Sequence, residues 1–193
     1  MSTATFATPA HESRNSLLGL LAVLAAPVFL VQWLAAAPAR ELPSDGLTAT
    51  LGLCYLVGFA CSVVALRRDR ATGRGAGAAA LFAVQLLGLA LAAGQQLQDA
   101  LQRRPLGNTV YGVCDLAWPV SHLLMLVAGV AVLRARVWTG WRRWTPLACG
   151  IALPASFLAM AVGGPRAMVP AFAIFTAAAF CALGVAVVTR GTS

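Results

Sequence analysis

Long apolar stretches separated by short polar ones make up most of the chain. Each apolar stretch is long enough to cross a bilayer as a helix, which takes about 20 residues. The stretches run from Ser16 to Ala36, Leu47 to Leu66, Ala76 to Leu97, Val110 to Leu133, Thr145 to Val162 and Met168 to Thr189. The pattern predicts an all-α, polytopic membrane protein whose fold is a bundle of six transmembrane helices.

The polar connections are too short to hold a soluble domain. We expect residues 1–15 to form an amino-terminal cytoplasmic tail, residues 16–190 a single transmembrane domain, and residues 191–193 a carboxy-terminal tail. Short connections favour antiparallel packing of consecutive helices, which would arrange the six helices as three hairpins. Ala35 to Ala37 resembles a signal-peptidase site, but the apolar run before it is longer than the ~7 to 15 residues of a signal sequence. We therefore expect a retained first helix.

Two of the connections resemble one another. Residues 66–73 read LRRDRATG and residues 133–140 read LRARVWTG, so both contain Leu-Arg, a second arginine and Thr-Gly. The second arginines, Arg70 and Arg136, are one position out of register. An internal duplication explains the similarity. Chance explains it as well, because helix ends rich in small apolar residues match easily and cytoplasmic ends tend to carry arginine.

Charge is scarce, and the basic residues are all arginine. Hydrophobic residues make up 60% of the chain and charged residues 10%, whereas soluble domains contain about 25% charged residues. Because the chain has no lysine, it cannot form a Schiff base with retinal. The net charge of +8 does not indicate nucleic acid as a partner, because the arginines lie in short loops rather than on one face of a domain.

The arginines divide unequally between the two sides of the predicted bundle. One side holds Arg14, Arg67, Arg68, Arg70, Arg74, Arg134, Arg136, Arg142, Arg143 and Arg190, and the other holds Arg40, Arg103, Arg104 and Arg166. Cytoplasmic loops carry the arginine excess, so we expect both termini in the cytoplasm of a bacterial inner-membrane protein. Trp138, Trp141 and Trp144 beside the arginines predict an anchor at the lipid headgroups.

The segment CDLAWPVSH, residues 114–122, places polar groups inside the fourth apolar stretch. Asp115 and His122 are seven residues apart, so they are expected to share one helix face, with Trp118 between them. Pro119 lacks an N–H and obstructs the carbonyl four residues earlier, which belongs to Asp115. Ionisable groups inside a membrane usually mark an ion path, a proton relay or a ligand site. This segment is therefore the first candidate site.

Other helices supply candidate partners for these groups. Gln85, Gln96 and Asp99 on the third predicted helix return near one face, while Gln32 lies in the first stretch and Tyr55 in the second. Most belong to the half of the bundle away from the cytoplasm, where the predicted cavity should open. The expected ligand-binding set is Asp115, His122, Gln96, Asp99, Gln85, Gln32, Tyr55 and Trp118.

A purely structural role is the alternative for the charged members of this set. Asp115 would then pair with Arg103 or Arg104 of the adjacent loop, His122 would bond a carbonyl, and Asp99 would pair with Arg103. Small residues such as Gly73, Gly77, Ala90 and Gly94 are expected to let helices approach closely. Both interpretations predict polar contacts between helices, but only the first predicts a polar cavity beside them.

The sequence argues against several kinds of chemistry. His11 and His122 are the only histidines, which are too few for a three-histidine zinc site, although a single-ligand haem at His122 is not excluded. The five cysteines contain no CxxC pair and are expected to act as small apolar residues. No Walker A, HExxH or GxSxG motif occurs. No metal or cofactor is indicated, and an intramembrane enzyme is the function least expected.

These features favour a membrane protein that binds a small ligand or proton in a polar cavity facing away from the cytoplasm. A cationic or hydrogen-bond-donating ligand would suit Asp115, with His122 as a deep gate or second acceptor and Gln96 and Asp99 as a vestibule. A small transporter or channel is one version of this hypothesis. The alternative is an accessory or assembly subunit of a larger membrane complex. A homo-oligomer is compatible with either function, and the lipid bilayer is a partner in both.

Overall fold

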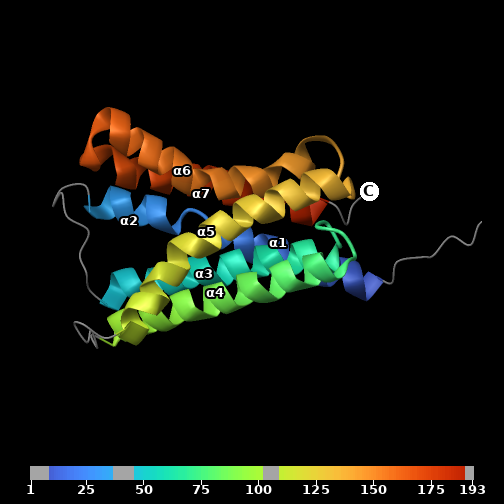
Figure 1. Cartoon of the computed structure of the whole chain (residues 1–193), viewed down its shortest axis with the longest axis horizontal. Helices are drawn as coiled ribbons and strands as arrows, with labels where there is room; N and C mark the ends of the chain where they lie inside the picture. Colours follow the sequence, from blue (N-terminus) through green and yellow to red (C-terminus); the bar gives the residue numbers. More distant parts are fainter. Residues whose placement is uncertain (1–8, 37–45, 102–108, 190–193) are drawn as a thin grey trace, which may run out of the picture.

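The computed structural model describes residues 9–36, 46–101 and 109–189, with the side chains of residues 9–14 left out. The helices are α1 (Pro9–Ala25), α2 (Val28–Ala36), α3 (Gly46–Arg68), α4 (Ala76–Ala100), α5 (Thr109–Ala135), α6 (Thr145–Gly163) and α7 (Pro165–Val188). A 3-10 helix, η1 (Gly140–Trp144), precedes α6. No strand occurs in these ranges (Figure 1). Six spans are long and apolar enough to cross a membrane, so the prediction of a six-helix, multi-pass membrane protein is confirmed.

The first span consists of α1 and α2, which are separated at Pro27. Proline has no N–H to donate to the carbonyl four residues earlier, which here belongs to Val23. The thiol of Cys181 in α7 lies 3.7 Å from that carbonyl oxygen and donates to it. The interruption thus leaves the Val23 carbonyl free to accept a hydrogen bond from α7. Helix α1 begins at Pro9, inside the predicted amino-terminal tail, while the remaining tail residues 1–8 and 191–193 lie outside the described ranges.

The six spans form a closed ring in chain order. Each span packs against the next one along the chain, and α1 also packs against α7. Helix α2 contacts α3 and α7, and α3 touches α7 across the ring. Tyr55, Phe59, Met125, Phe180 and Leu183 are among the largest fully buried side chains. Consecutive helices therefore pack as expected for antiparallel hairpins.

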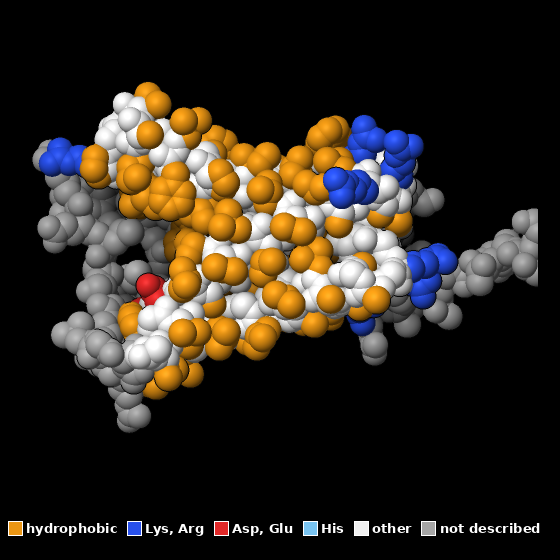
Figure 2. Space-filling model, in the orientation of Figure 1, with side chains coloured by type: hydrophobic (Ala, Val, Ile, Leu, Met, Phe, Trp, Pro, Cys, Tyr) orange, Lys and Arg blue, Asp and Glu red, His pale blue; other side chains and the backbone are white. Residues whose placement is uncertain are grey.

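The two ends of the bundle differ in charge. Arginines gather at one end, where α1 begins and α7 ends, while the surface between the ends is mostly hydrophobic (Figures 1 and 2). We call this the arginine-rich end; it carries Arg67, Arg68, Arg70, Arg74, Arg134, Arg136, Arg142 and Arg143. The opposite, arginine-poor end carries Arg166 among the described side chains. The described termini thus lie at the same end of the bundle.

The two similar connections also share a backbone conformation. Arg70 and Arg136 have positive φ angles of 53° and 52°, and Gly73 and Gly140 follow with φ of 99° and 61°. Left-handed backbone is unfavourable for a residue with a Cβ, but it ends a helix sharply and redirects the chain. The sequence similarity of these loops therefore extends to their turns.

Trp138, expected at the lipid headgroups, has a side chain that is only 2% exposed.

Glycines allow the closest helix contacts, but they are not the ones expected. A Cβ added to Gly150 would lie 2.3 Å from Leu126 Cα, and one added to Gly129 would lie 2.4 Å from Leu147 Cα, so α5 and α6 touch through their backbones. Gly19 and Gly184 make the equivalent contact between α1 and α7. By contrast, nothing lies within 4 Å of Gly77, and Gly94 meets only a side-chain sulfur at 3.8 Å. Spacing along one helix does not reveal which small residue faces a neighbour.

Candidate functional site

A buried hydrogen-bonded pair, Tyr55 and His122, joins α3 to α5 at the centre of the bundle. The two side chains are 1% and 0% exposed, and the Tyr55 hydroxyl lies 2.9 Å from His122 Nε2. His122 Nδ1 lies 3.0 Å from the carbonyl oxygen of Trp118. Because a carbonyl can only accept, Nδ1 carries the hydrogen. In the neutral ring Nε2 is then the acceptor, and Tyr55 donates to it.

Aromatic rings enclose this pair. The His122 ring lies 4.5 Å from Trp118, 5.2 Å from Phe59 and 5.4 Å from Phe172, measured between ring centres. The Tyr55 ring lies 4.6 Å from Phe29 and 5.5 Å from Phe180. An apolar surrounding of this kind favours the neutral imidazole, because a buried charge without a counter-charge is costly. The pair is therefore a neutral polar contact inside an aromatic shell.

A cavity of about 180 Å³ adjoins this shell on the side of the arginine-poor end. It lies between α2, α5, α6 and α7 and is lined by Phe29, Gln32, Trp118, Leu153, Met168, Val169, Phe172 and Ala173. Three of the lining rings, Phe29, Trp118 and Phe172, contact one another and also contact Tyr55 or His122. These three rings therefore separate the cavity from the pair.

The cavity wall includes few polar groups. The indole nitrogen Nε1 of Trp118 is buried and has no hydrogen-bond partner among the described residues. Gln32 lies on α2 and donates through Nε2 to the carbonyl of Thr48, 2.9 Å away, which ties α2 to α3. A buried N–H without an acceptor is uncommon and unfavourable. The Trp118 N–H is thus an unsatisfied donor on a side chain that lines the cavity.

The structure does not bring Asp115 to this site. The Asp115 side chain is exposed, while His122 on the same helix is fully buried. The buried face of α5 passes instead through Cys114, Ala117 and Ser121. His122 belongs to this buried face as well, whereas Asp115 lies outside it. The structure shows no bond from Asp115 to any described residue. Arg103 and Arg104, with which Asp115 would pair in a purely structural role, lie outside the described ranges. A ligand-binding role for Asp115 therefore stays a prediction.

Asp99 belongs to a separate polar cluster at the arginine-poor end. The Tyr111 hydroxyl donates to Asp99 Oδ1 over 2.9 Å, and Gln95 Nε2 donates to Asp99 Oδ2. Asp99 is 8% exposed and Gln95 6%. This cluster connects the end of α4 to the start of α5. Tyr111 was not among the expected site residues, although a tyrosine near a membrane boundary commonly finds a polar partner.

The two remaining glutamines serve other helix contacts. Gln96 packs its amide against Gly52 of α3, where an added Cβ would lie 2.6 Å from Gln96 Oε1. Gln85 is 2% exposed and donates through Nε2 to the carbonyl of Ser121, 2.8 Å away. Gln85, Gln96 and Asp99 therefore do not converge on one cavity. Of the expected set, the structure brings together Tyr55, His122, Trp118 and Gln32.

The aromatic residues of the site could not be selected from the sequence alone. Phe29, Phe59, Phe172 and Phe180 are ordinary members of apolar stretches, and their only signal is a position away from both ends of the first, second and sixth spans. Among the described residues no group of three His, Cys, Asp or Glu side chains could hold a metal ion. The five cysteines are free thiols, of which Cys114 and Cys149 are buried and Cys54 is exposed.

Comparison of the chain with protein-family models, curated proteins and solved structures yields no match.

Proposed function

We propose that this chain binds a small, largely apolar ligand that carries a hydrogen-bond acceptor, in the cavity between α2, α5, α6 and α7. The observation that carries the proposal is the combination of a cavity of about 180 Å³ with an unpartnered, buried indole N–H on Trp118, one of the side chains that line it. An engineered apolar cavity of ~150 Å³ is large enough for benzene. A ligand built on one substituted ring or a short branched chain therefore fits.

The lining favours an acceptor over the cationic or donating ligand that the sequence suggested. Among the described residues that line the cavity none is acidic, and these walls are mainly aromatic and aliphatic. Aromatic faces attract cations, but a desolvated cation would lack a counter-charge here. A ketone, ester or ether oxygen would instead accept from Trp118 while its apolar body fills the space. The proposed ligand is therefore neutral and carries a hydrogen-bond acceptor.

The cavity's position in the membrane follows from the arginines. If the arginine-rich end is cytoplasmic, as the positive-inside rule implies, the cavity belongs to the outer half of a bacterial inner membrane. A ligand would then reach it from outside the cell or from the outer leaflet. Transport of that ligand is a further step that needs a path through the Tyr55–His122 pair.

A matched pair of probes tests the proposal. Acetophenone and ethylbenzene have nearly the same shape, but only acetophenone carries an acceptor. We expect the purified protein in nanodiscs to bind acetophenone about 2- to 13-fold more tightly than ethylbenzene, because one hydrogen bond contributes ~0.5–1.5 kcal/mol. Calorimetric titration measures the difference. Tetramethylammonium in the same titration tests the cationic alternative, and its tighter binding would overturn the assignment.

Two variants assign the binding to the cavity. Trp118→Phe keeps an aromatic ring but removes the N–H, so we expect it to abolish the preference for acetophenone while ethylbenzene still binds. Ala173→Leu adds bulk at a buried lining position and should weaken both probes. Equal binding of the two probes to the unaltered protein, or binding unaffected by Ala173→Leu, would contradict the proposal. Co-purification of a stoichiometric protein partner, together with no probe binding, would favour the accessory subunit.

A further inference from the structure

An open groove follows the outer face of α5 toward the arginine-rich end of the bundle. Its volume is about 440 Å³. One wall is the loop after α3, where a Cβ added to Gly73 would lie 3.9 Å from Ala135 Cβ, so the loop and the helix are in contact. We call this hollow the α5 groove; its lining residues are Thr72, Gly73, Val127, Val130, Ala131, Arg134 and Ala135.

The floor of the α5 groove is apolar along most of its length and charged at one end. From Val127 to Arg134 the lining residues follow the spacing i, i+3, i+4 and i+7, which places their side chains on one helix face. Val127 is 54% exposed and Val130 is 37% exposed. With a rise of ~1.5 Å per residue, Val127 lies roughly 10 Å from Arg134 along the helix axis. The groove therefore changes from apolar to positively charged in the direction from the bilayer interior to the headgroups.

The arginine of the groove is available to an anion. Its side chain is exposed, and the structure shows no hydrogen bond or ion pair from Arg134 to any described residue. Asp69, the one acidic side chain described at this end, accepts a hydrogen bond from Asn15 of α1 over 2.8 Å. A guanidinium binds phosphate oxygens through paired N–H donors. The groove thus complements a molecule with an anionic group and an apolar body.

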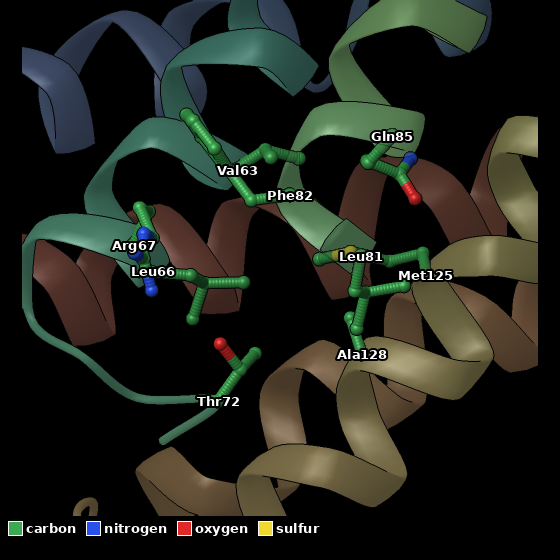
Figure 3. Close-up of a pocket in the computed structure, with 9 residues that line it drawn as sticks. All are labelled: Val63, Leu66, Arg67, Thr72, Leu81, Phe82, Gln85, Met125 and Ala128. Carbon is green, nitrogen blue, oxygen red and sulfur yellow. The ribbon is translucent and has the colours of Figure 1, made fainter. Parts of the chain in front are cut away.

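The space behind the groove is too small for such a molecule. Thr72 also lines a hollow of about 20 Å³ between α3, α4 and α5. Figure 3 shows Thr72 on the loop there, with Leu66 of α3 and Ala128 of α5 on either side. A single water molecule already needs ~10–15 Å³ of such space. A headgroup and its chains therefore stay on the outer side of Thr72, against α5.

We propose that the α5 groove binds one phospholipid with a negatively charged headgroup, from the leaflet at the arginine-rich end. Arg134 binds the lipid phosphate, and the start of an acyl chain packs on Val127 and Val130. A lipid fits better than a soluble anion, because most of the groove floor is apolar and belongs to a membrane span. The gathering of arginines at this end favours an anionic over a zwitterionic lipid. This site is independent of the ligand cavity.

Native mass spectrometry of the full chain, released from detergent micelles, counts the lipids that it retains. The probes are phosphatidylglycerol and phosphatidylcholine with identical chains, which differ in net charge. We expect one retained phosphatidylglycerol per chain, bound about fivefold more tightly than phosphatidylcholine, which is the effect of one arginine near a lipid surface. Glycerol 1-phosphate in large excess should not displace it, because it lacks the chains. Equal retention of the two lipids, or displacement by glycerol 1-phosphate, would overturn the proposal.

Matched variants locate the lipid in the groove. Arg134→Gln should lower the preference for phosphatidylglycerol about fivefold. Arg68→Gln removes the same charge from an exposed position outside the groove, so it should change the preference by less than about twofold. Ala131→Phe fills the groove without changing the charge and should reduce retention of both lipids, whereas Ala90→Phe, at an exposed position of α4, should not.

The controls decide between a site and a diffuse attraction. If Arg68→Gln acts as strongly as Arg134→Gln, lipid is attracted by the charge of the whole end and the groove site is refuted. Equal effects of Ala131→Phe and Ala90→Phe would refute it as well. If Ala131→Phe does not fold, the comparison of the two exposed arginines decides. None of these outcomes depends on whether acetophenone binds.

Discussion

The two halves of the bundle are packed by different means. At the arginine-rich half, glycines bring helix backbones into contact: Gly129 faces Leu147 and Gly150 faces Leu126, so each helix supplies a glycine to the other. At the arginine-poor half, Gly52 is covered by the flexible amide of Gln96. The cavity of about 180 Å³ lies in the arginine-poor half, beside Phe29, Trp118 and Phe172, whereas the hollow of about 440 Å³ at the arginine-rich end is a more open surface groove beside Thr72, Gly73 and the end of α5.

This difference shows how one bundle can be both rigid and hollow. Backbones that touch cannot separate without losing many contacts at once, because well-packed interfaces tolerate little deformation. Side chains that fill a gap between helices can change rotamer at lower cost. A ligand site is thus expected where the helices are held apart by Phe29, Trp118 and Phe172, and the glycine contacts stabilise the half opposite to it.

The largest expected effect comes from adding a methyl group at a backbone contact. Gly150→Ala places a Cβ 2.3 Å from Leu126 Cα, so α5 and α6 must separate. We expect the free energy of unfolding to fall by about 1–3 kcal/mol, as for other overpacked cores. Thermal unfolding in detergent measures it. The control is Gly112→Ala, where nothing lies within 4 Å and helix propensity predicts a gain of up to about 1 kcal/mol. Equal melting temperatures of the two variants would contradict a rigid backbone contact.

Removing the central hydroxyl is expected to have the next largest effect. Tyr55→Phe keeps the ring in its aromatic shell but leaves His122 Nε2 without a donor, which should destabilise the fold by about 1–2 kcal/mol. Tyr111→Phe removes the same group at a partly exposed position and should have a smaller effect. The same unfolding assay compares the two. A larger loss from Tyr111→Phe would mean that the end cluster, and not the buried pair, holds α5 in place.

A smaller effect is expected at Gly52, the glycine of the arginine-poor half. Gly52→Ala meets only the end of the Gln96 side chain, which can rotate away, so we expect a loss below about 1 kcal/mol. The double variant Gly52→Ala with Gln96→Ala relieves the clash, so it should be more stable than the sum of its single changes predicts. Additive effects would show that Gln96 does not pack against Gly52. A loss as large as that of Gly150→Ala would remove the contrast between the halves.

The smallest effect is expected at Asp115. Its side chain is exposed and does not line the cavity, so Asp115→Asn should change stability by no more than about 0.5 kcal/mol and leave acetophenone binding unchanged. Titration of the variant checks this. Loss of probe binding would restore Asp115 to the ligand-binding role that its place in an apolar stretch suggested.

The sequence predicted individual polar residues better than their partners. Tyr55 and His122 were both expected in a site because each is a polar group deep in an apolar stretch, yet nothing in their spacing showed that they would bond each other. Asp115 was assigned to the same face as His122 from helical periodicity. That periodicity describes one helix alone, whereas exposure of Asp115 depends on how far the neighbouring helices stand from it.

The sequence by itself determined the six spans, their order and the uneven placement of arginine. Helix length, hydrophobicity and charge are local properties, so each segment's insertion and orientation in the membrane depend mainly on its own residues. Only the tertiary structure decided which side chains meet. The rotation and tilt of each helix are set by contacts such as Gly150 against Leu126, between residues that belong to different helices. These contacts place the Tyr55–His122 pair at the centre of the bundle and leave the ligand cavity beside Trp118.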